Sequence, residues 1–218
     1  MKIAKIPATG EQFAIGKIVC LARNYAEHAK ELGNETPAAP VLFIKPASSV
    51  IGDGETVRIP QYSQECHYEV ELAVLIGKQC QAVSAETAMQ YVAGYGVGID
   101  MTLRDVQNQL KAKGLPWEIA KGFDTSCPLS SFVPASAVAD PHNLKLRLAV
   151  KGEVRQNGSS SDMIHRVPQI LSHISKIFTL EPGDVILTGT PSGVGPVKAG
   201  DVMDAEISGV GSLKVFVG

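Results

Sequence analysis

The sequence predicts an α+β fold rich in β-strands, and three observations lead to this fold class. Segments typical of strands outnumber those typical of helices, and the two kinds do not alternate as they would around a doubly wound parallel sheet. The 218 residues include 21 glycines and 13 prolines, but only 6% are aromatic, which indicates many turns between short strands. The length and an apolar fraction of 44% predict one domain, residues 1–218, around a sizeable core.

Strands are expected at apolar runs, most of which lie between glycine, proline, asparagine and aspartate residues. Six of these runs span residues 17–21, 41–44, 70–76, 144–150, 185–187 and 213–217. A seventh run, residues 95–99, contains two glycines and also has the pattern of a buried strand. The run at 70–76 is almost wholly apolar, so we expect it to be covered on both faces.

Helices are expected in the segments between these strands. They span residues 26–32, 85–91, 103–113 and 167–178. Ser84 is placed to cap the second helix, and Thr102 with Asp105 has the spacing of a capping box at the start of the third. Gly33 and Gly114 follow the first and third helices, and glycine commonly ends a helix.

Charge and composition exclude several classes of partner. The net charge is -2 and no lysine- or arginine-rich run occurs, whereas proteins that bind nucleic acid or a membrane surface usually show a basic excess. The N-terminal segment has neither the apolar stretch nor the cleavage site of a secretory signal. The four cysteines lack the two-residue spacing of zinc and redox motifs. We therefore expect a cytoplasmic protein with reduced thiols and without nucleic-acid or membrane partners.

Two glutamates stand at the start of the most informative strand. Glu69 and Glu71 are separated by one residue, so the alternation of side chains places them on one face, roughly 6–7 Å apart along the backbone. Carboxylates at that spacing can converge on one cation. An exposed strand end would also explain the pair, but the apolar run that follows predicts burial, and a buried glutamate needs a partner.

Asp100 supplies a third carboxylate at the end of the strand predicted at 95–99. A carboxylate at a strand end is well placed to line a site, although Asp100 could instead only cap the turn. Three carboxylates without a neighbouring histidine or cysteine at zinc spacing suit magnesium or manganese, because these hard cations prefer oxygen ligands. The sequence therefore predicts a divalent-cation site with positions left open for water or a chelating substrate.

Charged side chains that could face such a site follow Asp100. Arg104 and Gln107 are three residues apart on the predicted third helix and therefore share a face. Together they could hold a substrate carboxylate or carbonyl, and a solvated helix face is the alternative. Lys121 lies between apolar neighbours, where it could stabilise a developing enolate oxygen or simply be a surface lysine.

A histidine and a glutamate are paired on the first predicted helix. His28 and Glu31 are three residues apart, so they are neighbours on one helical turn. Such a dyad can take a proton from water, because the carboxylate orients the imidazole. The spacing alone is also common on exposed helices that have no catalytic role.

The glycine-rich segment 189–195 does not match a nucleotide-binding motif, because it lacks the lysine of a phosphate-binding loop. The glycines at 94, 96 and 98 likewise fail the spacing of the dinucleotide fingerprint. The backbone N–H groups of 189–195 could bind an anion, and an ordinary tight turn explains the segment equally well.

Seven segments taken together resemble the fumarylacetoacetate hydrolase family, in particular its short, single-domain acylpyruvase branch. They cover residues 17–197 with few breaks and read CLARNYAEHAKELG, PVLFIKPASSVIG, CHYEVELAVLIG, GYGVGIDMTLRDVQ, GLPWEIAKGFDTSCPLS, SSSDMIHRVPQIL and LEPGDVILTGTPSGVGPV. The resemblance implies a β-rich fold of stacked mixed sheets with a few short helices, and a homodimer. It also implies that residues 1–16 are a short N-terminal extension, because the extra N-terminal domain of the longer branch is lacking.

The resemblance assigns roles to the same side chains. It implies that Mg²⁺ or Mn²⁺ is bound by Glu69, Glu71 and Asp100. It implies catalytic roles for Lys121 and for the His28–Glu31 pair, which lies on a flexible helix over the site. The substrate-binding residues that we expect on this basis are Arg23, Arg104, Gln107 and Thr190.

The function implied is the magnesium-dependent hydrolysis of acylpyruvates, such as acetylpyruvate or fumarylpyruvate, to pyruvate and an acid. The substrate is thus a small 2-oxo acid with a β-carbonyl group, and oxaloacetate could be decarboxylated or tautomerised at the same site. One alternative is an isomerase or decarboxylase of unsaturated dicarboxylic acids in aromatic catabolism, which would use the same metal. The other is a non-enzymatic metal- or ligand-binding protein, which would leave Lys121 and the His28–Glu31 pair without a role.

Overall fold

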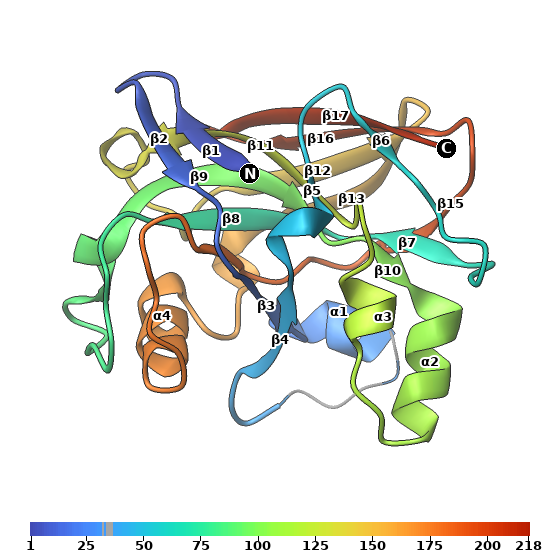
Figure 1. The fold of residues 1–218 in the computed structure, drawn as a ribbon, viewed down its shortest axis with the longest axis horizontal. Coiled ribbons are helices and arrows are strands. Elements are labelled where there is room, and N and C mark those ends of the chain that lie inside the picture. The colour runs from blue at the N-terminus through green and yellow to red at the C-terminus, as the bar shows by residue number, and fades with distance from the viewer. Residues whose placement is uncertain (32, 34–36) are drawn as a thin grey trace.

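The computed structural model describes residues 1–31, 33 and 37–218. Two large β-sheets are stacked, and the α-helices of the described residues gather along one side of them (Figure 1). A three-stranded sheet and an N-terminal hairpin complete the fold.

The larger sheet is mixed and contains seven strands. Their order is β4 (Val41–Lys45), β3 (Ile18–Ala22), β14 (Val185–Leu187), β8 (Val70–Ile76), β9 (Val92–Ile99), β11 (Cys127–Pro134) and β5 (Val50–Ile51). β8 lies at the centre and pairs antiparallel with both β9 and β14. Every residue of β8 is buried, as its apolar sequence predicts.

The second sheet contains five strands. Their order is β13 (Glu153–Ser159), β12 (Lys145–Val150), β16 (Val202–Ile207), β17 (Gly211–Val217) and β6 (Thr56–Val57). The main core lies between the two large sheets and includes Leu72 of β8 and Leu148 of β12. Ala73 and Leu75 belong to a second core on the opposite face of β8. Alternate side chains of β8 therefore serve two cores, which explains why the strand carries almost no polar residue.

Two smaller sheets flank these layers. β7 (Cys66–Tyr68) lies between β10 (Thr102–Leu103) and β15 (Gly195–Val197) and leads into β8. β1 (Ile3–Ile6) and β2 (Glu11–Ala14) pair with each other as an antiparallel hairpin. The hairpin buries Ala4 and Ile6 in the second core, so the segment before residue 17 is part of the packed structure.

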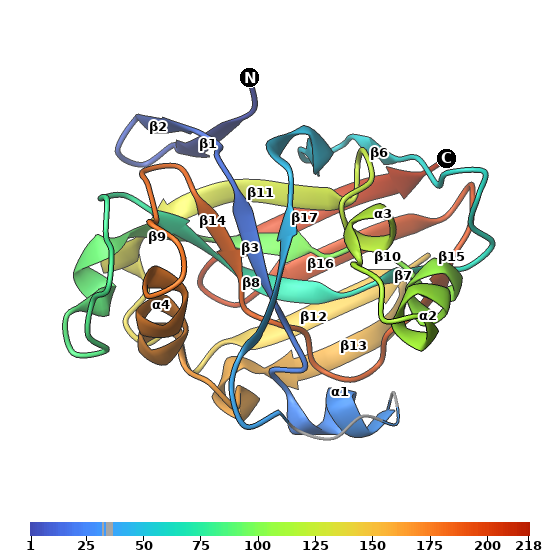
Figure 2. The ribbon, with the colours of Figure 1, turned by 60° about the horizontal axis from the view of Figure 1, so that its bottom comes forward.

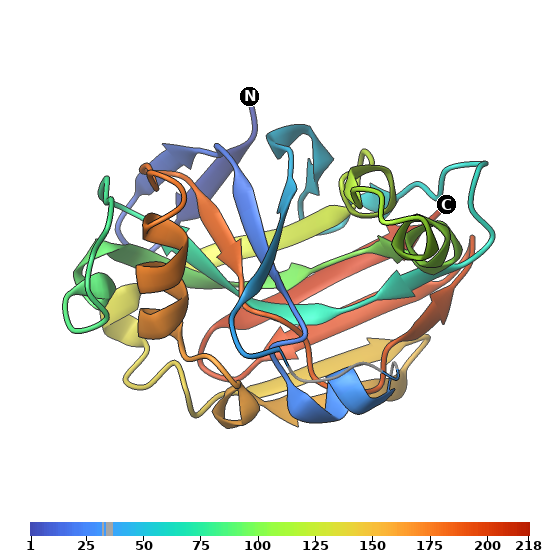
Figure 3. The same cartoon turned by 90° about the horizontal axis from the view of Figure 1, so that it is seen from below.

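The helices are short and stand at the ends of the sheets. α2 (Arg104–Ala112) and α3 (Glu118–Lys121) lie side by side at one end of the molecule, and α4 (Val167–Ser175) lies at the other (Figures 1 and 3). α1 (Ala26–Glu31) runs along the underside near β13 (Figure 2). None of the helices in the described residues is long and apolar enough to cross a membrane.

All seven predicted strand segments are strands in the structure. The helix predicted for 85–91 is wrong, because only a 3₁₀ turn forms at Ala88–Tyr91 before β9 begins at Val92. Hydrogen bonds between residues three apart in sequence close this turn, and the β-branched Val92 begins the next strand. The helix predicted for 26–32 is present over Ala26–Glu31. Residue 32 lies outside the described residues.

The predicted capping box at the start of α2 is also wrong. Thr102 belongs to β10 and α2 begins at Arg104 without a side-chain cap. Asp105 instead accepts hydrogen bonds from the Ser63 hydroxyl at 2.7 Å and the Gln64 N–H at 2.9 Å. The local pattern fails because tertiary contacts from the loop before β7 take the carboxylate that would have capped the helix.

Candidate active site

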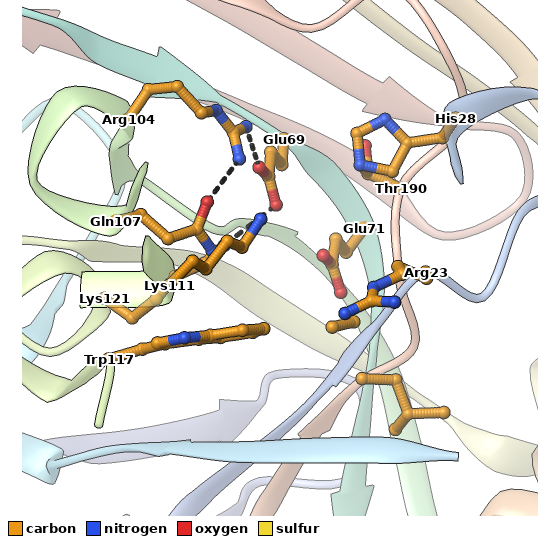
Figure 4. A pocket seen from close by; sticks show the side chains of 12 residues that line it. Arg23, His28, Glu69, Glu71, Arg104, Gln107, Lys111, Trp117, Lys121 and Thr190 are labelled. Atoms are coloured by element: carbon orange, nitrogen blue, oxygen red, sulfur yellow. Dashed lines mark hydrogen bonds and ion pairs between the residues drawn. The ribbon is translucent and has the colours of Figure 1, made fainter. Parts of the chain in front are cut away.

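A polar pocket opens where the ends of β3 and β8 meet α1, α2 and α3 (Figure 4). Its walls carry six arginine, lysine and glutamate side chains and one histidine. They are formed by Leu21, Ala22, Arg23, His28, Glu69, Glu71, Arg104, Gln107, Lys111, Trp117, Lys121 and Thr190.

The carboxylates of the pocket are placed by strand register. Glu71 lies in β8 and Glu69 precedes it by two residues, so both side chains leave on the same face. β9 runs antiparallel to β8 with Ile99 opposite Val70. Asp100 therefore lies opposite Glu69, and its backbone N–H donates to the Glu69 carbonyl at 2.8 Å.

One carboxylate oxygen from each of Glu69, Glu71 and Asp100 lies within 4.8 Å of the others. All three side chains are buried, with residue exposures of 5%, 1% and 1%. Oxygen atoms that converge in this way are the ligands that Mg²⁺ and Mn²⁺ prefer. The geometry brings together the three residues that the sequence pattern nominated.

Glu71 is the carboxylate that most needs a cation. Within the described residues its only hydrogen-bond donor is the Gly189 N–H, at 2.6 Å from Oε2. Burial raises the pKa of Glu71 well above its usual range, and the negative charges of Asp100 and Glu69 add to this effect. A divalent ion bound by the three carboxylates would relieve this repulsion, so the residues fit the metal that their spacing predicted.

Glu69 has the opposite environment. Its carboxylate accepts from Arg104 and, at 3.0 Å, from the Lys121 ammonium. Burial acts to raise the pKa of Glu69, but the charges of Lys121 and Arg104 outweigh it and hold that pKa well below its usual range. Glu69 is therefore held as a carboxylate and oriented at the same time.

Lys121 is fully enclosed by acceptors. Its ammonium lies 2.5 Å from Asp100 Oδ2, 2.5 Å from Thr102 Oγ1 and 4.8 Å from the centre of the Phe43 ring. Burial acts to lower the pKa of Lys121, but the charges of Asp100 and Glu69 outweigh it and raise that pKa. The side chain is therefore a fixed positive charge beside the three carboxylates, and the surface position that the sequence left open is excluded.

A second buried lysine lies behind the carboxylates. Lys45, at the end of β4, is 0% exposed and forms an ion pair with Asp100 at 2.8 Å. Its ammonium also donates to the carbonyls of Met101 and Ser126, each at 3.1 Å, and to the carbonyl of Lys121. Lys45 thus ties a predicted metal ligand to the segment that carries the active-site lysine.

We expect Lys45→Met to lower the free energy of unfolding by about 3–5 kcal/mol, because it leaves Asp100 and several carbonyls buried without their cation. Urea unfolding followed by circular dichroism measures the change. Lys214→Met is the matched control, since Lys214 pairs with Asp204 at 3.5 Å on the exposed surface and its loss should cost about 1 kcal/mol or less. Equal losses in the two variants would contradict the structural role of Lys45.

The predicted dyad on α1 is formed. His28 is 5% exposed, and its Nδ1 lies 3.2 Å from Glu31 Oε2. The other oxygen of Glu31 accepts from the Gly193 N–H at 3.0 Å. The imidazole therefore lines the pocket (Figure 4). The Glu31 carboxylate is fixed beside it, which is the arrangement that general-base catalysis requires.

The loop after β14 joins the two halves of the site. Gly189 has φ +95°, and a Cβ there would meet the Cβ of Asn24 at 2.8 Å, so only glycine fits. Its N–H binds Glu71, and Gly193 further along the loop binds Glu31. Two N–H groups of the 189–195 segment therefore bind carboxylates of the protein itself. The segment is neither a site for an external anion nor an ordinary tight turn, which were the two alternatives that its sequence left open.

One face of α2 supplies three polar side chains to the pocket. Arg104, Gln107 and Lys111 are spaced by three and four residues and so project in one direction. Arg104 donates to Gln107 Oε1 at 2.8 Å, and both residues are buried. The solvated helix face left open by the sequence is therefore excluded for these two residues.

All ten predicted site residues lie in or against this pocket. Eight of them line it, whereas Asp100 contacts Lys121 and Glu31 contacts His28 from behind. Lys45, Lys111 and Trp117 were not predicted from the sequence. Lys111 could have been predicted from its helical spacing to Gln107. Lys45 could not, because a lysine at the end of an apolar strand gives no sequence signal that it is buried.

Comparisons with known proteins agree with this geometry. Residues 17–217 match the sequence family described as fumarylacetoacetate (FAA) hydrolase, C-terminal. The mitochondrial oxaloacetate tautomerase of Bos taurus is 55% identical over 200 residues, which cover 92% of this chain and 90% of that protein.

Solved structures with other activities are similar as well. Fumarylpyruvate hydrolase from Pseudomonas aeruginosa, in complex with Mn²⁺ and pyruvate, aligns with a TM-score of 0.95 and 38% identity over 99% of this chain and 95% of that chain. The 2-hydroxyhepta-2,4-diene-1,7-dioate isomerase of Mycobacterium marinum aligns with a TM-score of 0.84 and 38% identity over 99% and 86%. The chain therefore resembles tautomerase, hydrolase and isomerase alike.

Proposed function

This chain belongs to the fumarylacetoacetate hydrolase family, and on that premise we propose that it is a magnesium- or manganese-dependent enzyme of short 2-oxo acids with a second carbonyl group. Oxaloacetate and acylpyruvates form this substrate class. The predicted β-rich fold of the family is confirmed. The observation that carries the proposal is that three carboxylates, Lys121 and the His28–Glu31 pair lie in or against one pocket.

Glu69, Glu71 and Asp100 are the residues that would hold the cation. When bound, a divalent cation supplies Lewis-acid stabilisation of negative charge on the 2-oxo oxygen of the substrate. The chain adds a second source of positive charge, because the ammonium of Lys121 is fixed beside the same carboxylates. A preorganised charge of this kind stabilises an enolate without reorganisation during the reaction.

Substrate orientation is assigned to the polar wall beside the carboxylates. Arg104 and Gln107 on α2 are buried and already joined by a hydrogen bond. They therefore form a rigid pair whose N–H groups can donate to a substrate carboxylate and carbonyl. Thr190 faces them from the loop after β14, and its hydroxyl oxygen accepts from Gln156 at 2.8 Å. That hydrogen bond leaves the Thr190 hydroxyl proton free to donate to a ligand.

Three reactions share the enolate that this site would stabilise. Tautomerisation of oxaloacetate moves one proton between C3 and the 2-oxo oxygen. Decarboxylation breaks the C3–C4 bond, releases carbon dioxide and leaves its electron pair on the enolate of pyruvate. Hydrolysis of an acylpyruvate also needs water, from which His28 takes a proton while the hydroxide adds to the distal carbonyl. The C–C bond then breaks, the acid leaves and the pyruvate enolate takes up a proton.

Oxaloacetate is the first candidate substrate, because the relative at 55% identity is an oxaloacetate tautomerase that matches over 90% of its length. Hydrolysis of an acylpyruvate is the second, and the His28–Glu31 dyad favours it over decarboxylation, because decarboxylation needs no activated water. The isomerase relatives keep the isomerisation of unsaturated dicarboxylic acids as an alternative with the same metal.

A substrate panel tests the proposal. Oxaloacetate, acetylpyruvate, fumarylpyruvate and an unsaturated dicarboxylic 2-hydroxy acid are each followed by absorbance with added Mg²⁺ or Mn²⁺. We expect turnover of oxaloacetate and of at least one acylpyruvate, loss of activity with EDTA and recovery on adding excess metal. Activity that survives complete chelation, or a panel without any turnover, would contradict the proposed function.

Two further features rest on the sequence and family resemblance alone. The protein is proposed to be a homodimer, as the family usually is. It is also proposed to be cytoplasmic, although the relative from Bos taurus is mitochondrial.

A further inference from the structure

Two cations of the pocket have no assigned contact in the mechanism proposed above, although the family resemblance implies that Arg23 binds substrate. Arg23 and Lys111 both line the space in front of the carboxylates. We propose that they form a second anion subsite that binds the distal carboxylate of a dicarboxylic 2-oxo acid and makes the site selective for dianionic over monoanionic substrates. This inference rests on the proposed function, since it concerns the far end of the same substrate.

The two side chains approach from different walls. Lys111 projects from α2 one turn beyond Gln107, and its ammonium stands 5.3 Å from the centre of the Trp117 ring. Arg23 enters from the end of β3, and its guanidinium lies across the pocket from Arg104, near Glu71 (Figure 4). A ligand that fills the space in front of the carboxylates would therefore lie against both of these cations.

The other two cations of the pocket are already engaged. Arg104 and Lys121 both form ion pairs with Glu69. Among residues 1–31, 33 and 37–218, neither Arg23 nor Lys111 forms an ion pair with a carboxylate. Burial lowers the pKa of the half-buried Lys111, and the positive charges of Arg104 and Arg23 lower it further. The subsite thus concentrates positive charge that an incoming anion would neutralise.

The backbone at Arg23 is held in an uncommon conformation. Its φ of 59° lies in the left-handed region that residues with a side chain rarely adopt. The next residue fixes it, because the Asn24 amide donates to the carbonyls of Thr188 at 2.8 Å and His165 at 3.0 Å. The Asn24 side-chain oxygen accepts from the His165 N–H at 2.8 Å. Strained backbone positions that are held by several surrounding contacts occur preferentially at ligand sites. Here the strained backbone directs the Arg23 guanidinium into the pocket.

The charge balance indicates which ligands suit the subsite. A divalent ion would offset two of the three carboxylate charges, which leaves one negative charge facing four cations in the pocket wall. The charges of Lys45 and Glu31, which lie at the margins of the pocket, cancel each other in this balance. The excess of three positive charges matches the enolate of a dicarboxylic 2-oxo acid, which carries two carboxylates and one enolate oxygen. The enolate of acetylpyruvate carries one negative charge fewer.

A pair of stable ligands isolates the distal carboxylate. N-oxalylglycine and N-methyloxamate share the same chelating end and differ only by the terminal carboxylate. Isothermal titration with Mg²⁺ present should show N-oxalylglycine binding about 10–100-fold more tightly to the native protein, the range expected for hydrogen bonds to a charged group. Lys111→Met and Arg23→Gln should each reduce this preference about tenfold or more, chiefly by weakening N-oxalylglycine.

Lys113→Met is the matched control, because Lys113 follows α2 two residues after Lys111 and is exposed outside the pocket. It should leave the ratio of the two dissociation constants within about twofold of the native ratio, which corresponds to well under 1 kcal/mol. The ratio of kcat/KM for oxaloacetate to that for acetylpyruvate should fall in Lys111→Met and Arg23→Gln but not in Lys113→Met.

The outcomes separate the subsite from the proposed function. Equal binding of the two ligands by the native protein, or a loss of preference in Lys113→Met as large as in Lys111→Met, would overturn the subsite and leave the proposed function standing. Failure of both ligands to bind in the presence of Mg²⁺ would overturn the proposed function as well. Arg23→Gln provides an independent result if Lys111→Met does not fold.

Discussion

Replacing Glu71 by glutamine is expected to abolish divalent-ion binding while raising the thermal stability of the metal-free protein. Glu71 is buried beside Asp100 and Glu69 and has a single neutral donor among the described residues. The amide removes a repelled negative charge from this cluster, so the metal-free fold gains stability. It also removes one of three proposed ligands, and since the metal supplies several kcal/mol to the transition state, kcat/KM should fall about 10³-fold or more.

Glu69→Gln is the matched comparison, because it also removes a proposed ligand but from the opposite environment. Arg104 and Lys121 lose a buried partner in that variant, so the metal-free protein should become less stable. Thermal denaturation with and without Mn²⁺, together with titration of the metal, distinguishes the two variants. Retained metal affinity in Glu71→Gln, or a fall in its metal-free melting temperature equal to that of Glu69→Gln, would refute the assignment of Glu71.

The carboxylate site was predictable because it depends on two local rules. Alternation along a strand places Glu69 and Glu71 on one face whatever the rest of the fold does. The position of Asp100 needs one more fact, namely that β8 and β9 are antiparallel neighbours in a register that sets Ile99 against Val70. The sequence indicates a strand end at Asp100 but carries no local signal for that register.

The residues that escaped prediction are fixed by tertiary structure. Lysine is almost never fully buried unless it is paired, and the acceptors of Lys45 come from Asp100, Met101, Lys121 and Ser126, which are distant in sequence. Thr102 was predicted as a helix cap, but its hydroxyl oxygen instead accepts a hydrogen bond from the buried Lys121 ammonium. Local pattern rules fail here because the side chains are committed to the site.

The His28–Glu31 dyad should separate hydrolysis from the other reactions of the same enolate. His28→Ala is expected to lower kcat/KM for hydrolysis of acetylpyruvate or fumarylpyruvate by about 10²–10⁴-fold, the usual contribution of a general base. Decarboxylation of oxaloacetate needs no nucleophile, so it should retain much of its rate. Lys121→Ala should lower both rates, because both reactions pass through an enolate that this ammonium stabilises.

Glu31→Ala should show the same selectivity as His28→Ala to a smaller degree, because Glu31 orients and charges the imidazole but does not receive the proton from water. Glu27→Ala is its matched control, since Glu27 is exposed on the same helix and outside the pocket. The measurements are kcat/KM for both substrates at saturating Mg²⁺, with the rate of oxaloacetate tautomerisation followed separately. If His28→Ala depressed hydrolysis and decarboxylation equally, activation of water would not be its role. A parallel loss of tautomerisation would then identify the dyad as the group that moves the substrate proton, and tautomerase would describe this enzyme better than hydrolase.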